Sequence, residues 1–169
     1  MPARPRSRPV DLFAYLDGLG IAHTTVDHPA FHTVEDGRDL KASLPGGHTK
    51  NLFMKDKDGV IVLISAMADS ALKLNQLHKL IGTRRLSFGS PDLMLDALGV
   101  VPGSVTAFAL MNDTDHRVRF LVDAALMAHD VLNFHPLVNT ATTAIPRPDF
   151  ERFVAATGHG LEVVDFSAL

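Results

Sequence analysis

Lys50 and Asn51 are two adjacent polar side chains that could act on a ligand. They lie near the start of a strand predicted over residues 48–55. Side chains alternate along a strand, so Lys50 and Leu52 are expected on one face. Asn51 and Phe53 are then expected on the other. A lysine at the start of a strand is usually a solvated edge charge. The alternative is that this segment belongs to a ligand site.

Two further segments carry groups suited to an anionic or polar ligand. Residues 99–106 hold two glycines and a proline, which make a stiff loop whose backbone N–H groups could receive an anionic oxygen. The other interpretation is an ordinary turn between a helix and a strand. Residues 133–143 contain His135, followed by a proline and several small hydroxyl residues. They form either a polar strand or part of a ligand site.

Familiar catalytic and metal-binding signatures are missing. The absence of cysteine excludes disulfides, thiolate metal sites and a cysteine nucleophile. The sequence has no glycine-rich dinucleotide or phosphate-binding loop and no G-x-S-x-G elbow. His28 and His32 are four residues apart, but Pro29 disfavours the helix that would align them on a metal. We therefore expect no metal and no cofactor.

The composition is typical of one globular domain. The chain has 169 residues, of which 46% are hydrophobic and 21% charged. No apolar run approaches the ~20 residues that span a bilayer, and the N-terminus lacks the apolar core of a secretory signal. We expect a cytoplasmic protein that does not bind membranes. Residues 1–9, with three arginines, are predicted to form a flexible basic arm, and residues 10–169 a single domain.

The charge balance argues against long nucleic-acid contacts. Sixteen basic residues against nineteen acidic ones give a net charge of −3. Proteins that neutralise many phosphates along a duplex are usually basic, so DNA binding is not expected. A short contact with one end of a nucleic acid remains an alternative, because a local cluster of basic residues is not visible in the net charge of the chain. The densest basic patch (Lys79, Arg84 and Arg85) is either a solvated helix end or a phosphate contact.

Periodicity, capping and turn signals divide the chain into short elements. Helices are predicted from Val10 to Gly18, from a capping box at residues 33–36 to a stop at residues 45–47, from Asn75 to Gly82 with Leu77, Leu80 and Ile81 turned inward, from Ser90 to Gly99, and from Pro148 to Gly158. Strands are predicted over residues 21–27, 48–55, 60–67, 105–111, 117–122, 131–134, 140–145 and 161–165, with a hairpin turn at Asp58-Gly59. This order favours an α/β protein with a mixed or antiparallel sheet and helices packed outside it.

Five motifs occur in an order that matches a known family. They are His28-Pro29 with Thr33-Val34-Glu35, residues 49–56, residues 102–106, His135-Pro136 with residues 139–143, and Gly158-His159 with residues 164–166. Together they resemble the YbaK-like aminoacyl-tRNA deacylases, which are related to the editing domain of bacterial prolyl-tRNA synthetases. The resemblance covers residues 10–167. Within the family the sequence is most similar to the free-standing alanyl-tRNA(Pro) deacylases called ProXp-ala.

The resemblance implies a mixed α/β fold in which short helices surround a largely antiparallel, curved sheet. It also implies an enzyme that hydrolyses the ester joining a wrong amino acid to the 3′ end of a tRNA. An aminoacyl ester is already activated, so position, a water molecule and stabilisation of the oxyanion suffice. The ribose 2′-hydroxyl is implied to help position or activate that water. No cofactor is implied.

The quoted motifs would each supply part of the site by this resemblance. The residues implied in catalysis are Lys50, Gly103, Ser104 and His135. The residues implied in substrate binding are Asn51, Val105, Thr106, Asn139 and Thr140. The loop would present backbone N–H groups to the acyl carbonyl or the ribose. Whether His135 transfers a proton or only shapes the pocket is left open.

Size selection is the harder physical problem for such an enzyme. An apolar pocket separates substrates that differ by one methylene by only ~1–3 kcal/mol, so a synthetase for proline cannot fully exclude alanine. A second, hydrolytic site must then admit alanine and reject proline. Its wall is predicted to contain Phe31, Leu52 and Val105.

Two alternatives and the partners complete the predicted function. A larger pocket would make the chain a cysteinyl-tRNA(Pro) deacylase. A non-catalytic module that binds tRNA or an aminoacyl nucleotide is the other alternative. The expected partner is the acceptor end of mischarged tRNA(Pro), contacted by the basic patch, and prolyl-tRNA synthetase is a second candidate partner.

Overall fold

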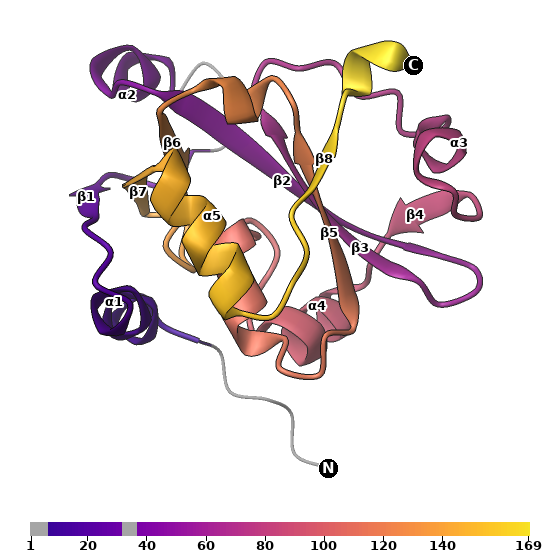
Figure 1. The fold of residues 1–169 in the computed structure, drawn as a ribbon, viewed down its shortest axis with the longest axis horizontal. Helices are drawn as coiled ribbons and strands as arrows, with labels where there is room; N and C mark the ends of the chain where they lie inside the picture. The colour runs from indigo at the N-terminus through magenta and orange to yellow at the C-terminus, as the bar shows by residue number, and fades with distance from the viewer. Residues whose placement is uncertain (1–6, 32–36) are drawn as a thin grey trace.

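A single sheet forms the centre of the computed structural model, which describes residues 7–31 and 37–169 (Figure 1). Within these residues its eight strands are β1 (Thr24–Asp27), β2 (Gly47–Asp56), β3 (Ile61–Met67), β4 (Leu86–Phe88), β5 (Val118–Asp123), β6 (Val131–Phe134), β7 (Ala141–Pro146) and β8 (Glu162–Val164). They follow the order β1-β7-β6-β2-β3-β5-β8, and β4 pairs with β2. Four pairings are antiparallel and three are parallel. The predicted α/β class with a mixed, largely antiparallel sheet is confirmed.

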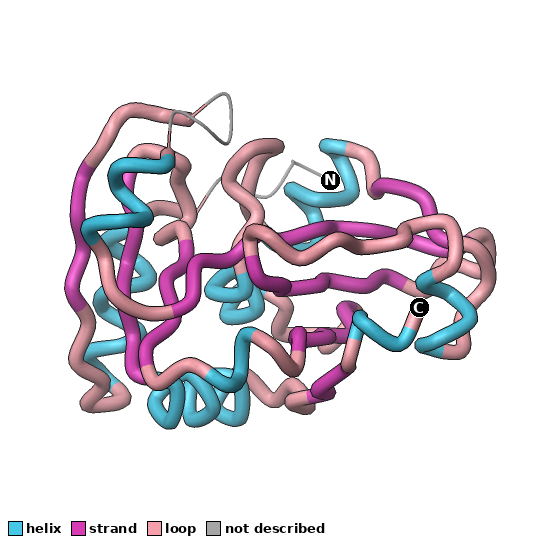
Figure 2. The backbone as a smooth tube through the Cα atoms, turned by 90° about the horizontal axis from the view of Figure 1, so that it is seen from above, coloured by secondary structure: helices cyan, strands magenta, loops and turns pink. Residues whose placement is uncertain are grey.

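Helices lie on both sides of the strands (Figure 2). The described α-helices are α1 (Pro9–Gly18), α2 (Arg38–Ser43), α3 (Leu77–Ile81), α4 (Pro91–Leu98) and α5 (Arg147–Ala156). Short 3-10 helices are η1 (Ala107–Asn112), η2 (Leu126–Ala128) and η3 (Phe166–Ala168). None of the helices in the described residues is both long and apolar enough to cross a membrane.

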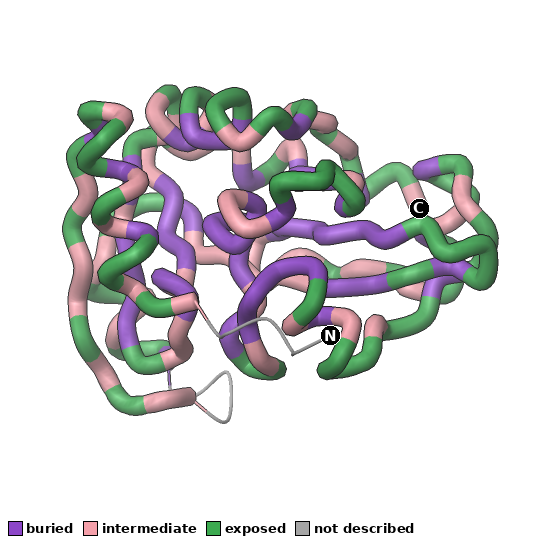
Figure 3. Tube along the Cα trace, turned by 90° about the horizontal axis from the view of Figure 1, so that it is seen from below, coloured by how far each residue is buried: buried purple, intermediate pink, exposed green. Residues whose placement is uncertain are grey.

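Each face of the sheet carries its own apolar cluster because side chains alternate along the strands. Phe53 belongs to the larger cluster, together with residues of α1, α4 and α5. Met54 belongs to the smaller cluster, where Leu52 packs against it beside residues of α3. The predicted separation of Leu52 from Phe53 is confirmed. Figure 3 shows the buried strands between more exposed helices and loops.

Local sequence signals set several element boundaries. In α4 the hydroxyl of Ser90 accepts the N–H of Leu93 at 3.1 Å, and Pro91 occupies the first turn. Gly99 ends the helix at φ +68°, a backbone conformation that favours glycine. The hairpin between β2 and β3 also forms, with Gly59 at φ +89°. The helix after residue 10, the helix before Gly158 and the other predicted strands, apart from residues 105–111, form with slightly different ends.

Two predictions about elements need correction, and two more fall wholly or partly outside the described residues. Residues 105–111 are not a strand, because Ala107–Asn112 form the helix η1 with Thr106 as its N-cap. Helix α3 begins at Leu77 after the N-cap Gln76, and Leu80 is 37% exposed instead of buried. The capping box at residues 33–36 and residues 1–6 of the basic arm lie outside the described residues.

A buried hydrogen bond joins the segment after α5 to the turn before β5. His159 Nε2 lies 2.8 Å from Asp113 Oδ2, and the two side chains are only 3% and 1% exposed. Asp113 also accepts the backbone N–H groups of Arg117 and Val118. On the other side of the ring, Nδ1 lies 2.8 Å from the Thr157 hydroxyl. His159, part of the fifth motif, therefore has a structural position in this fold.

Replacing His159 by leucine should lower the free energy of unfolding by about 3 kcal/mol, because it leaves the buried Asp113 carboxylate without its hydrogen-bond partner on the ring. Urea unfolding followed by circular dichroism measures the change. The control is Asp58→Asn, which breaks the exposed Arg84–Asp58 pair and should cost less than about 1 kcal/mol. An equally small loss for His159→Leu would contradict the structural role.

Candidate functional site

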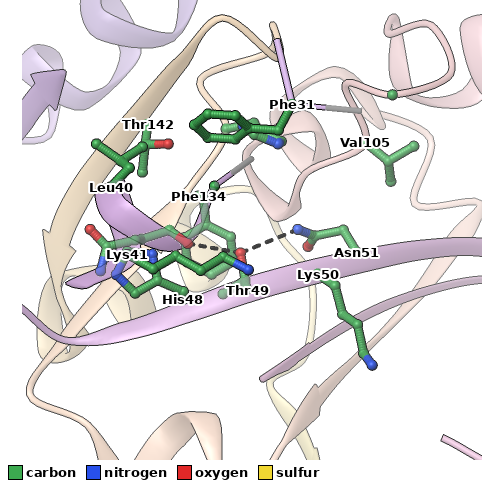
Figure 4. A pocket seen from close by; sticks show the side chains of 14 residues that line it. Phe31, Leu40, Lys41, His48, Thr49, Lys50, Asn51, Val105, Phe134 and Thr142 are labelled. Carbon is green, nitrogen blue, oxygen red and sulfur yellow. Dashed lines mark hydrogen bonds between the residues drawn. The ribbon is translucent and has the colours of Figure 1, made fainter. Parts of the chain in front are cut away.

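A cavity of about 430 Å³ lies at the start of β2, under α2 and beside the end of β6 and the start of β7. Its volume falls in the range of ~300–1,000 Å³ typical of small-ligand sites. Six of the residues predicted for the site line it: Phe31, Lys50, Asn51, Gly103, Val105 and His135. Figure 4 shows the cavity from close by.

The pairing of three strands brings these segments together. Gly47 and His48 pair in parallel with Leu132 and Asn133 of β6, so the start of β2 lies beside the end of β6. The antiparallel pairing of β6 with β7 then adds the start of β7. The Thr49 hydroxyl donates to the backbone carbonyl of Asn133 at 2.8 Å and so links β2 to β6.

The Asn133 side chain fixes the turn that leads into β2. Its amide nitrogen donates to the carbonyls of Pro45 at 3.0 Å and Gly47 at 3.3 Å. Both donors of the amide are thereby used, and Asn133 is 2% exposed. The turn residue Gly46 has φ +99°, and a Cβ there would lie 2.4 Å from the carbonyl oxygen of Val131. Only glycine fits at this crossing, which places the first residues of β2 at the cavity.

Lys50 directs its ammonium away from the other side chains of the cavity. The ammonium donates to the carbonyl of Ser70, and the Ser70 hydroxyl donates to Asp123 at 3.0 Å. Figure 4 shows the Lys50 side chain leaving β2 on the side opposite Phe31 and Thr142. Lys50 therefore lines the cavity at its edge, while its charge is held on the other face of the sheet.

Asn51 presents its amide nitrogen to the cavity. Its Oδ1 accepts the hydroxyl of Ser65 on the neighbouring strand β3. Its Nδ2 makes one long contact, 3.4 Å, to the Thr49 hydroxyl (Figure 4). An amide nitrogen has two donors, so one N–H remains for a ligand.

The loop before η1 presents only part of its backbone to the cavity. The N–H of Ser104 donates to the Val101 carbonyl at 3.0 Å, and Gly103 has φ +88°, which fits a type II turn. Ser104 is 1% exposed. The Thr106 hydroxyl accepts the N–H of Phe108 at 3.3 Å. Gly103 and Val105 thus line the cavity, whereas Ser104 and Thr106 serve the turn and the interior.

His135 is held in one tautomer when its ring is neutral. Its Nδ1 lies 3.1 Å from the Ala141 carbonyl, which can only accept, so Nδ1 carries the proton. Burial lowers the pKa of His135, the Ala141 carbonyl raises it, and repulsion between the protonated forms of His135 and the nearby His28 lowers it further. The lowered pKa favours the neutral ring at neutral pH. Nε2 is then a hydrogen-bond acceptor on a residue that lines the cavity.

The remaining predicted site residues lie outside the cavity lining. Asn139 is adjacent to the loop, since a Cβ on Gly103 would lie 3.2 Å from its amide nitrogen. Thr140 is exposed, and its carbonyl accepts the N–H of His28. Leu52 packs against the smaller apolar cluster.

The basic patch is also separate from the cavity. Lys79 lies on α3 and is exposed, as are Arg84 and Arg85 in the segment that leads into β4. The Arg84 guanidinium lies 3.3 Å from Asp58. In Figure 1, α3 and β4 lie on the opposite side of the molecule from α2.

Several lining residues were not predicted: Lys41, His48, Thr49, Asn133 and Thr142. Thr49, Asn133 and Thr142 lie inside the segments singled out from the sequence, but nothing in the sequence indicated which hydroxyl or amide would face inward. Lys41 had no signal, because a lysine on a short helix is ordinarily solvated. The described lining residues include two lysines and two histidines but no carboxylate.

Metal ligands are also scarce in the described part of the chain, where no group of three or more His, Asp or Glu side chains could hold an ion. The hydrogen-bonding groups at the cavity include the amide N–H of Asn51, the backbone near Gly103 and Nε2 of His135.

Residues 28–153 match the aminoacyl-tRNA editing domain family, and this stretch contains all the residues that line the cavity. The chain belongs to this family. It is also 36% identical over 156 residues to the mouse protein named prolyl-tRNA synthetase associated domain-containing protein 1, covering 89% of this chain and 92% of that protein. The editing domain is 30% identical over 155 residues to the prolyl-tRNA editing protein ProX of Acetoanaerobium sticklandii, covering 91% and 94% of the two chains.

A solved structure shares the fold. It is described as a candidate trans-editing enzyme for prolyl tRNA synthetase, and it matches with a TM-score of 0.68 at 17% identity, covering 94% of this chain and 98% of the other. Membership of the family makes this editing domain an enzyme, an aminoacyl-tRNA deacylase, as the sequence predicted.

Proposed function

We propose that this editing domain hydrolyses alanyl-tRNA(Pro) in trans in the cytoplasm, with the acceptor end of the tRNA in the cavity at the start of β2. The observation that carries the proposal is the placement of an acceptor, Nε2 of His135, and a donor, the amide N–H of Asn51, on residues that line one cavity. Phe31 and Val105 line the same cavity and supply its apolar wall.

These groups suffice for ester hydrolysis. The neutral His135 accepts a proton from the attacking water through Nε2, and the ribose 2′-hydroxyl helps to position that water. When the bond between the acyl carbon and the ribose 3′-oxygen then breaks, the protonated His135 returns this proton to the leaving 3′-oxygen. The amide N–H of Asn51 and the backbone N–H of Gly103 donate to the oxyanion that forms at the acyl carbon. A preorganised cavity supplies the remaining contribution by holding the ester and the water close together.

Phe31 is the wall residue held most firmly. Its ring stacks on that of His28, with centroids 4.4 Å apart and planes 6° from parallel. A Cβ added to Gly37 would lie 3.1 Å from the same ring. A wall held from two sides cannot retreat to admit a larger side chain, so alanine is accepted and the bulkier proline is rejected.

The basic patch supplies a proposed second contact with the tRNA. Lys79, Arg84 and Arg85 are exposed, and among residues 7–31 and 37–169 the only carboxylate paired with their side chains is that of Asp58, beside Arg84. They would contact phosphates of the acceptor stem beyond the 3′ end. Such a contact weakens as salt increases.

The experiment that tests the proposed function is a deacylation panel with alanyl-, cysteinyl-, seryl- and prolyl-tRNA(Pro). Alanyl-tRNA(Pro) should be hydrolysed fastest and prolyl-tRNA(Pro) should persist. Fastest hydrolysis of the cysteinyl ester would replace alanine by cysteine as the substrate. Binding of a non-hydrolysable aminoacyl-adenosine without turnover of any ester would make the chain a binding module.

Replacing Phe31 by alanine should raise the hydrolysis of prolyl-tRNA(Pro) relative to alanyl-tRNA(Pro) by about tenfold, because a lost wall removes ~1–3 kcal/mol of size discrimination. Single-turnover rates on the two substrates measure this ratio. Leu52→Ala is the control, since Leu52 lies on the opposite face of the sheet. An unchanged ratio in Phe31→Ala would remove Phe31 from the selective wall.

A further inference from the structure

The hydroxyl of Thr142 is oriented by a histidine outside the cavity lining. Nδ1 of His28 lies 2.8 Å from the carbonyl oxygen of Pro29, and a carbonyl can only accept, so Nδ1 carries the proton. In the neutral ring Nε2 is then an acceptor. It lies 2.8 Å from the Thr142 hydroxyl, which must donate to it. The single proton of Thr142 therefore points at His28, and the free lone pair of its oxygen is left for the cavity that Thr142 lines.

Other polar side chains that line the cavity also donate their hydrogen bonds to backbone carbonyls of the protein. The Thr49 hydroxyl donates to the Asn133 carbonyl at 2.8 Å. The Asn133 amide donates to Pro45 and Gly47, and its buried Oδ1 has no hydrogen-bond partner within the described structure. A buried acceptor without a partner calls for a donor.

This arrangement selects the kind of group that fits beside Thr142. The side chains of Thr142 and Thr49 both offer oxygen acceptors, and the described lining contains no carboxylate. The α-amino group of an aminoacyl ester donates hydrogen bonds in either protonation state. A hydroxyl ligand would need only one acceptor, whereas an amino group uses several.

We propose that His28 is a positioning residue that makes Thr142 a hydrogen-bond acceptor for the α-amino group of the aminoacyl ester. This inference rests on the proposed function. His28 also stacks on Phe31, so one residue orients both the polar and the apolar recognition of the aminoacyl group. The site thereby distinguishes esters of amino acids from esters of simple carboxylic acids.

The test compares alanyl-tRNA(Pro) with propionyl-tRNA(Pro), which is the same ester with hydrogen in place of the α-amino group. The quantity measured at pH 8 is the ratio of kcat/KM for the two substrates. Thr142→Val and His28→Asn should each lower this ratio at least tenfold relative to the wild type, because intrinsic differences between the esters cancel. Thr142→Ser keeps the hydroxyl and should retain the wild-type ratio.

The matched control is Thr143→Val, which removes a hydroxyl from the next residue of β7, where Thr143 bonds to Thr25 on the other face. It should leave the ratio unchanged. If Thr142 had only a structural role, Thr142→Val would lower kcat/KM for both substrates in parallel. An unchanged ratio in Thr142→Val would therefore overturn the inference. The inhibition constants of 3′-alanylamino- and 3′-propionylamino-deoxyadenosine give the same comparison without turnover. Failure of the wild type to hydrolyse any aminoacyl-tRNA would instead refute the proposed function.

Discussion

Replacing His135 by asparagine or alanine should lower kcat for alanyl-tRNA(Pro) hydrolysis by about 10²-fold or more, the contribution expected of a positioned general base. Both variants lose Nε2. Asparagine still places an amide N–H near the position of Nδ1 and can keep the hydrogen bond to the Ala141 carbonyl. Single-turnover rates for both variants separate proton transfer from pocket shape. Near wild-type rates in His135→Asn, with a large loss in His135→Ala, would show that His135 only shapes the pocket.

The pH profile provides a second readout of the same residue. Burial is the main cause of the lowered pKa of His135, so the neutral, proton-accepting ring persists below the ordinary range of a histidine. For the wild type, kcat/KM should rise with pH through an apparent pKa below about 6.5 and then level off. His135→Asn should lose this limb. A wild-type limb above the ordinary histidine range would argue against His135 as the base.

Replacing Lys50 by alanine should lower kcat/KM by about 10²-fold and reduce the dependence of KM on salt by the equivalent of about one phosphate contact. The structure holds its ammonium on the Ser70 carbonyl. The expected loss therefore requires the ammonium to exchange this neutral acceptor for a phosphate of the bound tRNA, which is the stronger, charge-assisted contact.

Lys55→Ala is the matched control for this prediction, because Lys55 is an exposed lysine on the same strand. It should leave kcat/KM and its salt dependence close to the wild-type values. Wild-type activity in Lys50→Ala would assign Lys50 to the link between β2 and Ser70 and remove it from the site.

Much of the fold could be predicted because local signals agree with tertiary packing. The Ser90-Pro91 start and Gly99 end of α4, and the Asp58-Gly59 hairpin, are set by backbone chemistry within a few residues. The sequence favours a strand over residues 105–111, where the structure has a helix, because a short and largely buried apolar run has the same pattern in both. The three-residue strand β4 gave no periodic signal.

The site was predicted only in part for a related reason. Alternation along β2 correctly separated Asn51 from Lys50, so it placed their side chains on opposite faces. The loop before η1 has no such periodicity. Ser104 and Thr106 are predicted to present N–H groups to a ligand, but the N–H of Ser104 donates within the turn, and the hydroxyl of Thr106 caps η1. The orientation of the Thr142 hydroxyl depends on His28, 114 residues away in sequence, and no local sequence pattern predicts such a contact.

The most direct test of size-selective hydrolysis is a series of esters of increasing volume on one tRNA. Single-turnover rates are measured for alanyl-, 2-aminobutyryl- and prolyl-tRNA(Pro) with the wild type in excess. Each added carbon should slow hydrolysis by roughly 10- to 200-fold, the discrimination expected per methylene at a rigid apolar wall. Equal rates along the series, or a rate that rises towards the prolyl ester, would contradict a cavity that selects its substrate by size.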